Sequence, residues 1–247
     1  MIRVEHHEPA RIIEIVIDRP EKRNALTPDM LRNLKDGATR AHESHARAVL
    51  LCGAGDVFCS GFDLALCRDD ASAMGDLLTT LSHAIRSLRR LSCPVVVSAQ
   101  GAAVAGGCAL LGGADIVVSD RAATLGYPVV RLGGSPAVTS PLLRHSLNPA
   151  RTRERLLDPA TITGERAHAL GLVHHLADSP GEVRARAFAI AADLAAKPPH
   201  SLSATKRWLN ELDGSDNDAL FADALRASLS LAGGPEERAL LASVWKK

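Results

Sequence analysis

The sequence predicts an α/β fold in which helices cover a sheet of mostly parallel strands. Apolar runs of strand length, such as 46–53 and 94–100, alternate with a stretch of helical apolar spacing at 75–91. A chain of 247 residues, 46% of them hydrophobic, is long enough to bury the core of one large domain. Glycine and alanine dominate residues 101–116, between two of the predicted strands.

The first half of the chain carries clear signals for where elements begin and end. Two β-rich runs, 3–8 and 11–18, predict a hairpin or a sheet edge. The sequence Thr-Pro-Asp at 27–29 predicts an N-cap and the first turn of a helix that ends near residue 43. Pro94 ends the next helical pattern before the following strand.

The second half of the chain is mostly helical from residue 136 onward, apart from a short predicted strand at 172–177. The sequence Lys-Pro-Pro at 197–199 interrupts this pattern. We therefore predict an α/β core of residues 1–196 and a helical C-terminal region of residues 197–247. The predicted late helices are 182–196, 201–211, 216–231 and 236–245.

The composition excludes several classes of partner. The 29 basic and 28 acidic residues are scattered, and aromatic residues make up only 3%, so no nucleic-acid-binding surface is expected. The N-terminal segment lacks the apolar region of a signal peptide, and no window has the length of a membrane span, so we expect a cytoplasmic protein. The five cysteines form no C-x-x-C pair, and the adjacent pairs His6-His7 and His174-His175 would point to opposite faces of a strand. We therefore expect reduced thiols and no metal site.

Two glycine turns are the features best suited to chemistry. The segments FCSGFDL at 58–64 and VAGGCAL at 104–110 place glycine where a strand ends and a helix is expected to begin. Helix starts expose backbone N–H groups with positive dipole character, and glycine lets a ligand approach the backbone. Two such turns side by side would aim two amides at one oxygen, as in an oxyanion hole. The alternative for each turn alone is tight packing of a helix on a strand.

Five motifs occur in an order and spacing typical of one known family. They are DRPEKRNAL at 18–26, FCSGFDL, PVVVSAQGAAVAGGCALLGGADI at 94–116, LGYPVVRLG at 125–133 and ITGERAHALGLVHHL at 162–176. With these motifs the chain resembles the enoyl-CoA hydratase/isomerase (crotonase) superfamily. The resemblance implies a ClpP/crotonase-like fold of repeated ββα units and C-terminal helices that assemble a homo-trimer or a dimer of trimers. It also implies an acyl-CoA ligand, with coenzyme A entering as part of the substrate and no tightly bound cofactor.

The resemblance also implies binding roles for individual positions. The two oxyanion donors would be the backbone amides of Ser60 and Gly106. Four residues would hold the nucleotide end of coenzyme A: Arg23, Ala25, Asp63 and Leu64. Asp63 would serve equally well as a helix cap, and Arg23 as a solvated turn residue.

Two positions depart from the family pattern. Family hydratases use two glutamates to handle the water and the α-proton, and those positions are Ala109 and Val129 here. An aliphatic side chain cannot transfer a proton, so neither orthodox hydration nor an isomerisation that relies on the second glutamate is expected. Decarboxylation of a malonyl-type thioester or thioester hydrolysis would fit, because each needs the oxyanion hole but no glutamate at these positions.

Three alternatives to this hypothesis stay open. A catalytically silent acyl-CoA-binding paralogue or partner subunit would bind coenzyme A without turnover. An enoyl-CoA hydratase with substitute residues would still hydrate. A serine hydrolase of Clp-like fold would use Ser60 as its nucleophile, although no histidine has a spacing that marks it as the base. Cys59 and Cys108 flank the oxyanion positions and are expected to be small buried packing residues rather than nucleophiles.

Three side chains are candidates for the pocket beside these aliphatic positions. Tyr127 lies two residues before Val129 and is expected in the pocket, in a catalytic or a lining role. His83 lies on the polar face of the helix at 75–91, which lines the acyl pocket in relatives, so it is either catalytic or solvated. Arg131 would share the side of Val129 if this segment is β-like, which predicts a place at the pocket or in a surface ion pair.

Overall fold

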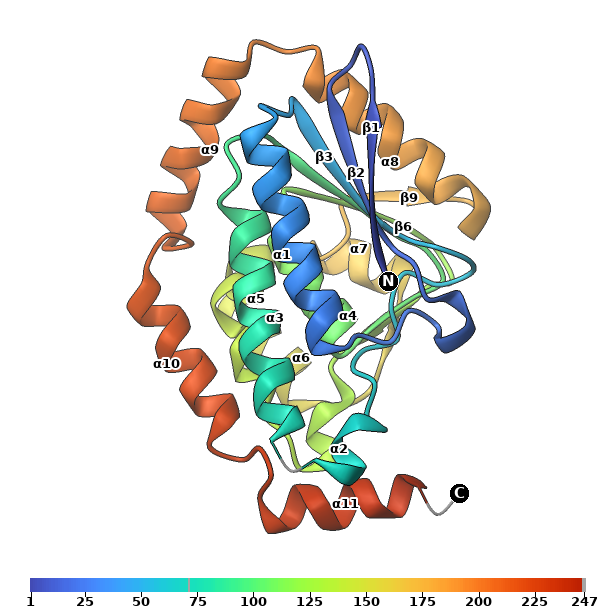
Figure 1. The fold of residues 1–247 in the computed structure, drawn as a ribbon, viewed down its shortest axis with the longest axis vertical. Helices are drawn as coiled ribbons and strands as arrows, with labels where there is room; N and C mark the ends of the chain where they lie inside the picture. The colour runs from blue at the N-terminus through green and yellow to red at the C-terminus, as the bar shows by residue number, and fades with distance from the viewer. Residues whose placement is uncertain (71, 246–247) are drawn as a thin grey trace.

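The main sheet of the protein has six strands in the order β1-β2-β3-β4-β6-β9 (Figure 1). The computed structural model describes residues 1–70 and 72–245. β1 and β2 form an antiparallel hairpin, and every later neighbouring pair is parallel, as predicted. The strands are β1 (Ile2–His7), β2 (Ile12–Ile17), β3 (Ala48–Gly53), β4 (Val95–Ala99), β6 (Ile116–Asp120) and β9 (His175–Ala177).

Helices cover both faces of this sheet. α1 (Pro28–Glu43) and α3 (Ala73–Arg89) pack together on one face, and α8 (Pro180–Ala195) packs on the other against β3, β4 and β6 (Figure 1). α1 begins where predicted, because the Thr27 hydroxyl accepts a hydrogen bond from Met30 N at 3.2 Å. β2 is buried along its whole length, with side chains in the cores on both faces.

A smaller sheet of three strands contains part of the glycine- and alanine-rich segment. β5 (Ala102–Val104) pairs in parallel with β7 (Thr124–Gly126), which pairs antiparallel with β8 (Ile162–Thr163). Gly101 connects β4 to β5 with a positive φ of 65°, and a Cβ there would lie 2.2 Å from the Asp56 carbonyl oxygen. Only glycine fits this turn, which delivers β5 to the start of the short helix α4 (Gly106–Leu110).

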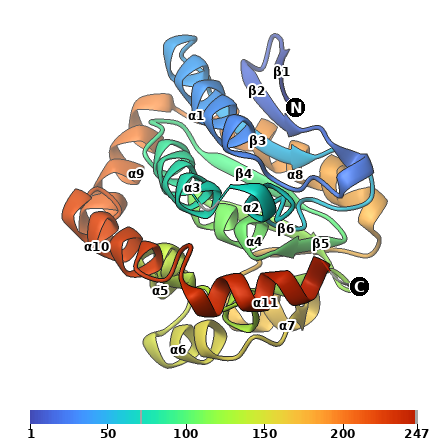
Figure 2. The same cartoon turned by 60° about the horizontal axis from the view of Figure 1, so that its bottom comes forward.

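The C-terminal helices form an arm outside the layer of α1 and α3 (Figures 1 and 2). Lys206 anchors the first of them, since its buried ammonium donates to the Asp115 carboxylate at 2.6 Å and to the Cys93 carbonyl at 2.9 Å. The arm consists of α9 (Pro199–Asp213), α10 (Asp218–Leu229) and α11 (Pro235–Trp245).

The last two helices of the arm pack on the segment that follows β7. Ser228 on α10 accepts a hydrogen bond from Val138 N at 2.9 Å and donates to the Ser135 carbonyl at 2.8 Å. These bonds fix α10 against the 3₁₀ helix η4 (Pro136–Thr139), while α11 packs on the 3₁₀ helix η3 (Pro128–Leu132). The arm therefore encloses space between itself and the body of the protein.

The remaining elements are short. They are η1 (Pro20–Lys22), α2 (Leu66–Asp69), η2 (Leu111–Gly113), α5 (Ser140–Ser146), α6 (Pro149–Leu157) and α7 (Gly164–Leu170).

The helices predicted for the last part of the chain are present, whereas the domain boundary at residue 197 and the trimer stay predictions. No helix within residues 1–70 and 72–245 is long and apolar enough to cross a membrane.

Candidate functional site

A largely apolar cavity of about 170 Å³ lies between the C-terminal arm and the body of the protein. Its walls come from the 58–64 turn, α3, the start of α4, η3, η4, α10 and α11. No histidine is among the described residues that line it, so no imidazole base lies beside Ser60 in the cavity, which argues against a serine hydrolase. The polar side chains of the lining are Ser60, Tyr127, Ser135, Thr139, Ser228 and Glu237.

Gly106 places a free amide in the cavity wall. It is the first residue of α4, so its N–H has no acceptor within the helix, and no side-chain cap or other backbone acceptor is found for it among the described residues. The other glycine turn lies directly beside it, because a Cβ on Gly61 would be 3.8 Å from Gly106 N. The structure thus brings the two predicted turns together.

The second predicted donor is corrected by the structure. The Ser60 N–H already donates to the Arg23 carbonyl at 3.0 Å, so it is not available to a ligand. On either side of Phe62, the Gly61 carbonyl accepts from Leu26 N at 2.8 Å and Asp63 N donates to the Leu26 carbonyl at 2.9 Å. Phe62 N itself has no acceptor among the residues described. The candidate donors are therefore Phe62 and Gly106, while Ser60 lines the cavity.

Ala109, Val129 and Tyr127 all line the cavity, as predicted. Ala109 is buried on α4, and Val129 is half-buried on η3. The buried Tyr127 hydroxyl donates to the Cys108 carbonyl at 3.3 Å, and burial raises the Tyr127 pKa well above its ordinary value. Tyr127 therefore stays protonated, and its O–H is hydrogen-bonded to the Cys108 carbonyl in the cavity wall. This favours a lining role over a catalytic one.

The residues predicted to hold the nucleotide end of coenzyme A lie together beside the 58–64 turn. Arg23 is exposed, with a left-handed φ of 51°. The Arg19 guanidinium donates to the Asp63 carboxylate at 2.8 Å and to the Ala25 carbonyl at 3.2 Å, and Leu64 lines the cavity. Asp63 is thus engaged in an ion pair that holds the loop before α1 against the glycine turn.

Two predicted residues lie outside the cavity. His83 is exposed on α3, whose cavity-lining residues are Met74, Leu78 and Leu81. Arg131 is exposed because its segment is a 3₁₀ helix and not β-like. With three residues per turn, positions two apart point in different directions, so Arg131 does not share the side of Val129.

Glu237 is a cavity residue that no sequence motif marks. It is 3% exposed, and its Oε2 accepts a hydrogen bond from Gly233 N at 2.6 Å. Burial raises the Glu237 pKa above its ordinary value, and the Gly233 bond only partly opposes this. In the sequence, Pro-Glu-Glu at 235–237 is an ordinary helix start, and only the packing of α11 on η3 brings this carboxyl to the cavity.

Comparison with known proteins places the chain among relatives of the same architecture. Residues 7–222 match the model of the enoyl-CoA hydratase/isomerase family. The chain belongs to this family. Crystal structures of enoyl-CoA hydratase/isomerases from Mycobacterium paratuberculosis and Xanthobacter autotrophicus Py2 match with TM-scores of 0.87 and 0.88, at 27% and 26% identity. The matches cover 98% and 100% of this chain and 97% and 93% of those chains, so the predicted crotonase fold is confirmed.

Two proteins with similar sequences have names that describe an activity. A Thermus thermophilus protein named as an enoyl-CoA hydratase is 32% identical over 215 residues, which is 84% of this chain and 83% of the relative. A Mycobacterium tuberculosis protein is 30% identical over 232 residues, which is 92% of each chain. It is named (7aS)-7a-methyl-1,5-dioxo-2,3,5,6,7,7a-hexahydro-1H-indene-carboxyl-CoA hydrolase.

The cysteines beside the glycine turns of this enoyl-CoA hydratase/isomerase family member are packing residues, as predicted. Cys59 and Cys108 are fully buried. Burial raises the pKa of Cys59 to about 12 and that of Cys108 to about 11. Both thiols are therefore protonated near neutral pH and are poor nucleophiles.

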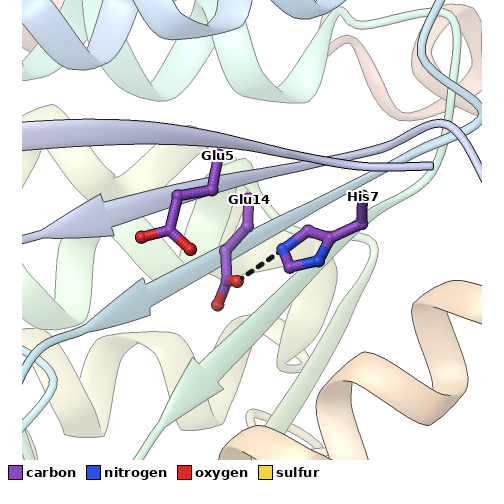
Figure 3. Close-up of side chains that lie close together, drawn as sticks. All are labelled: Glu5, His7 and Glu14. Atoms are coloured by element: carbon purple, nitrogen blue, oxygen red, sulfur yellow. Dashed lines mark hydrogen bonds and ion pairs between the residues drawn. The ribbon is translucent and has the colours of Figure 1, made fainter.

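The side chains of Glu5, His7 and Glu14 form a cluster that could in principle hold a metal (Figure 3). Glu14 is 1% exposed, and it accepts hydrogen bonds from Arg184 Nε of α8 at 2.7 Å and from Cys52 Sγ at 3.1 Å, while His7 Nε2 lies 2.9 Å from its other oxygen. The Arg184 guanidinium supplies the positive charge that a metal ion would bring. This cluster is explained as an ion-pair network that joins α8 to the sheet, away from the cavity.

The Glu14 network should contribute to stability in a pH-dependent way. Burial alone raises the Glu14 pKa, but hydrogen bonds from Arg184, Cys52 and His7 outweigh it, so the pKa lies below its ordinary value. A carboxyl with a lowered folded-state pKa stabilises the fold above its unfolded-state pKa. That contribution is lost as the pH falls through the folded-state pKa.

Replacing Arg184 with alanine should lower the free energy of unfolding at neutral pH by about 1 to 2 kcal/mol, because it leaves a buried carboxylate without its cation. This loss of unfolding free energy is smaller than that expected for a fully buried ion pair, because the Arg184 side chain is 48% exposed. At acidic pH, where Glu14 is protonated, the difference from the wild type should shrink. Urea unfolding at both pH values measures this, with the exposed Arg186→Ala as control, and an unchanged difference would contradict it.

Proposed function

We propose that this chain is an acyl-CoA enzyme that stabilises an enolate or a tetrahedral thioester oxyanion with the backbone amides of Phe62 and Gly106. The observation that supports it is a pair of adjacent turns, each with an unused N–H at one apolar cavity, in a member of the enoyl-CoA hydratase/isomerase family. Fixed N–H donors stabilise negative charge that develops on an oxygen, and they do so most strongly where water is excluded. Coenzyme A would enter only as part of the substrate.

The reaction that we propose passes through an enolate and is not orthodox hydration. Ala109 and Val129 occupy the cavity wall and cannot exchange protons. When a malonyl-type thioester loses carbon dioxide, the electron pair of the broken carbon–carbon bond moves toward the thioester carbonyl. The negative charge then develops on the carbonyl oxygen, where the amides of Phe62 and Gly106 would stabilise it.

Hydrolysis is the second candidate reaction. It is favoured by the 30% identity, over 92% of the chain, to a protein named as the hydrolase of a carboxyl-CoA compound. The tetrahedral anion formed by attack of water on a carbonyl needs the same two donors.

Calorimetric titration with coenzyme A and acyl-CoAs tests the binding, and assays with malonyl-CoA, methylmalonyl-CoA and crotonyl-CoA test the reaction. We expect binding together with decarboxylation or hydrolysis. Rapid hydration of crotonyl-CoA would overturn our interpretation of Ala109 and Val129. Binding without any turnover would instead favour a silent acyl-CoA-binding subunit, and the absence of binding would overturn the proposal.

A further inference from the structure

The C-terminal helix α11 supplies the one acidic side chain among the described residues that line the cavity, Glu237. The other titratable group among the described lining residues, Tyr127, uses its O–H to donate a hydrogen bond to the Cys108 carbonyl. A thioester bound at the amides of Phe62 and Gly106 would therefore meet one carboxyl able to exchange a proton with its acyl part.

The Glu237 carboxyl is held at the cavity through one of its oxygens. Glu237 is the third residue of α11, and its side chain reaches back over the helix start so that Oε2 accepts the Gly233 N–H at 2.6 Å. Oε1 has no hydrogen-bond partner among the residues that the structure describes. It lies 3.9 Å from the position that a Cβ on Gly134 would occupy, and the Cβ of Val129 lies 3.9 Å from the same position. The free carboxylate oxygen and the Val129 side chain thus lie close to each other in the lining of the cavity.

Gly133 allows α11 to approach this closely. A Cβ on Gly133, whose φ is 74°, would lie 3.0 Å from both Cα and N of Glu237. A side chain at this position would push the helix away and withdraw the carboxyl from the cavity.

Helix capping accounts for only half of this arrangement. A cap needs one acceptor oxygen, and threonine or asparagine side chains supply it at α1, α6, α7 and α10. Glu237 is 3% exposed, and its Oε1 reaches the cavity space with no partner among the described residues, a placement that costs free energy and that a cap does not require. The raised Glu237 pKa brings its proton affinity closer to that of an acid–base group working near neutral pH.

We propose that Glu237 is the proton-transfer group of this site and acts at the carbon α to the thioester carbonyl. The proposal rests on the proposed function, since it needs a thioester bound at the two amides. The carboxylate takes the proton from the α carbon, the electron pair of that C–H bond forms a double bond to the carbonyl carbon, and the carbonyl π pair moves to the oxygen. The resulting enolate is held by Phe62 N and Gly106 N. The carboxylic acid then returns the proton to the α carbon or, in a β,γ-unsaturated chain, to the γ carbon.

The same group completes a decarboxylation. Loss of carbon dioxide leaves an enolate whose α carbon must gain a proton, and the protonated Glu237 would supply it. One carboxyl therefore serves both reactions that pass through the enolate.

The experiment follows proton transfer in full-length protein with 3-hexenoyl-CoA as the probe. Deuterium uptake at the α carbon in heavy water is measured by NMR, and movement of the double bond by the absorbance of the conjugated product. We expect Glu237→Gln to lower both rates by about 100-fold or more while acyl-CoA affinity changes little. Glutamine keeps the oxygen that accepts the Gly233 N–H, so the helix start is preserved. The matched control is Glu236→Gln, an exposed neighbour on the same helix, which should behave as wild type.

The outcomes separate this proposal from the proposed function. If calorimetry detects no binding of acyl-CoA, both proposals fail. If acyl-CoA binds and the wild type neither exchanges the α proton nor moves the double bond, the role of Glu237 is overturned while binding at the amides stands. Equal rates in Glu237→Gln and the wild type would likewise assign this carboxyl to helix capping alone.

Discussion

Replacing Gly106 with proline should lower kcat for the acyl-CoA substrate by about 100- to 1000-fold, the cost typical of losing one oxyanion donor. Proline has no N–H, so the change deletes the proposed donor. The first residue of a helix is a position where proline is tolerated, but the Ala105 backbone before it, at φ 51° and ψ −116°, has to adjust to a following proline. The measurement is kcat at saturating acyl-CoA, with thermal unfolding to verify the fold.

Gly106→Ala is the matched control for this change. It keeps the N–H but adds a Cβ that would lie 2.8 Å from Cε1 of the Phe62 ring, so it has the crowding that proline also introduces. The ratio of kcat between the alanine and proline variants therefore isolates the amide. If the two variants turn over equally, Gly106 is not an oxyanion donor.

Features that depend on neighbours in the sequence were predicted well. The helix expected at 28–43 is α1 with those limits, because its cap, proline and first-turn acid lie within three residues of each other. The helix expected at 75–91 is found at Ala73–Arg89, since its apolar spacing and the following Pro94 are local signals. The same holds for the site, where both glycine turns and the aliphatic Ala109 and Val129 lie at the cavity.

Features that depend on distant contacts were not predictable from the sequence. The Ser60 N–H donates a hydrogen bond to the Arg23 carbonyl, and this contact forms only when the loop before α1 pairs with the glycine turn. The N–H that remains free in this turn is therefore that of Phe62. Arg131 points outward because its segment coils as a 3₁₀ helix. Glu237 reaches the cavity from more than one hundred residues beyond Val129, through the packing of α11 on η3, and no local pattern distinguishes it from a helix-start glutamate.

The place of the carboxyl in the cavity can be tested by moving it from one wall to another. The double variant Glu237→Gln with Val129→Glu should recover proton transfer at the α carbon to within about 10-fold of the wild type, from a loss of about 100-fold or more in Glu237→Gln alone. The free Glu237 oxygen and the Val129 Cβ flank the same point at 3.9 Å, so a glutamate grown from η3 enters the region that the α11 carboxyl leaves.

Two further variants show whether this recovery is caused by the transferred carboxyl. Glu237→Gln with Val129→Gln has the same size and hydrogen-bonding capacity but no titratable group, so it should remain inactive. Val129→Glu alone places two carboxyls in one small cavity, and because like charges raise the pKa of one of them, it should gain nothing over the wild type. Recovery in the glutamate double variant but not in its glutamine counterpart means that the site needs one carboxyl facing the α carbon, whichever helix supplies it. No recovery in a folded, acyl-CoA-binding double variant would mean that proton transfer needs the geometry of α11 itself, since a displacement of about 1 Å is enough to lose most of the rate.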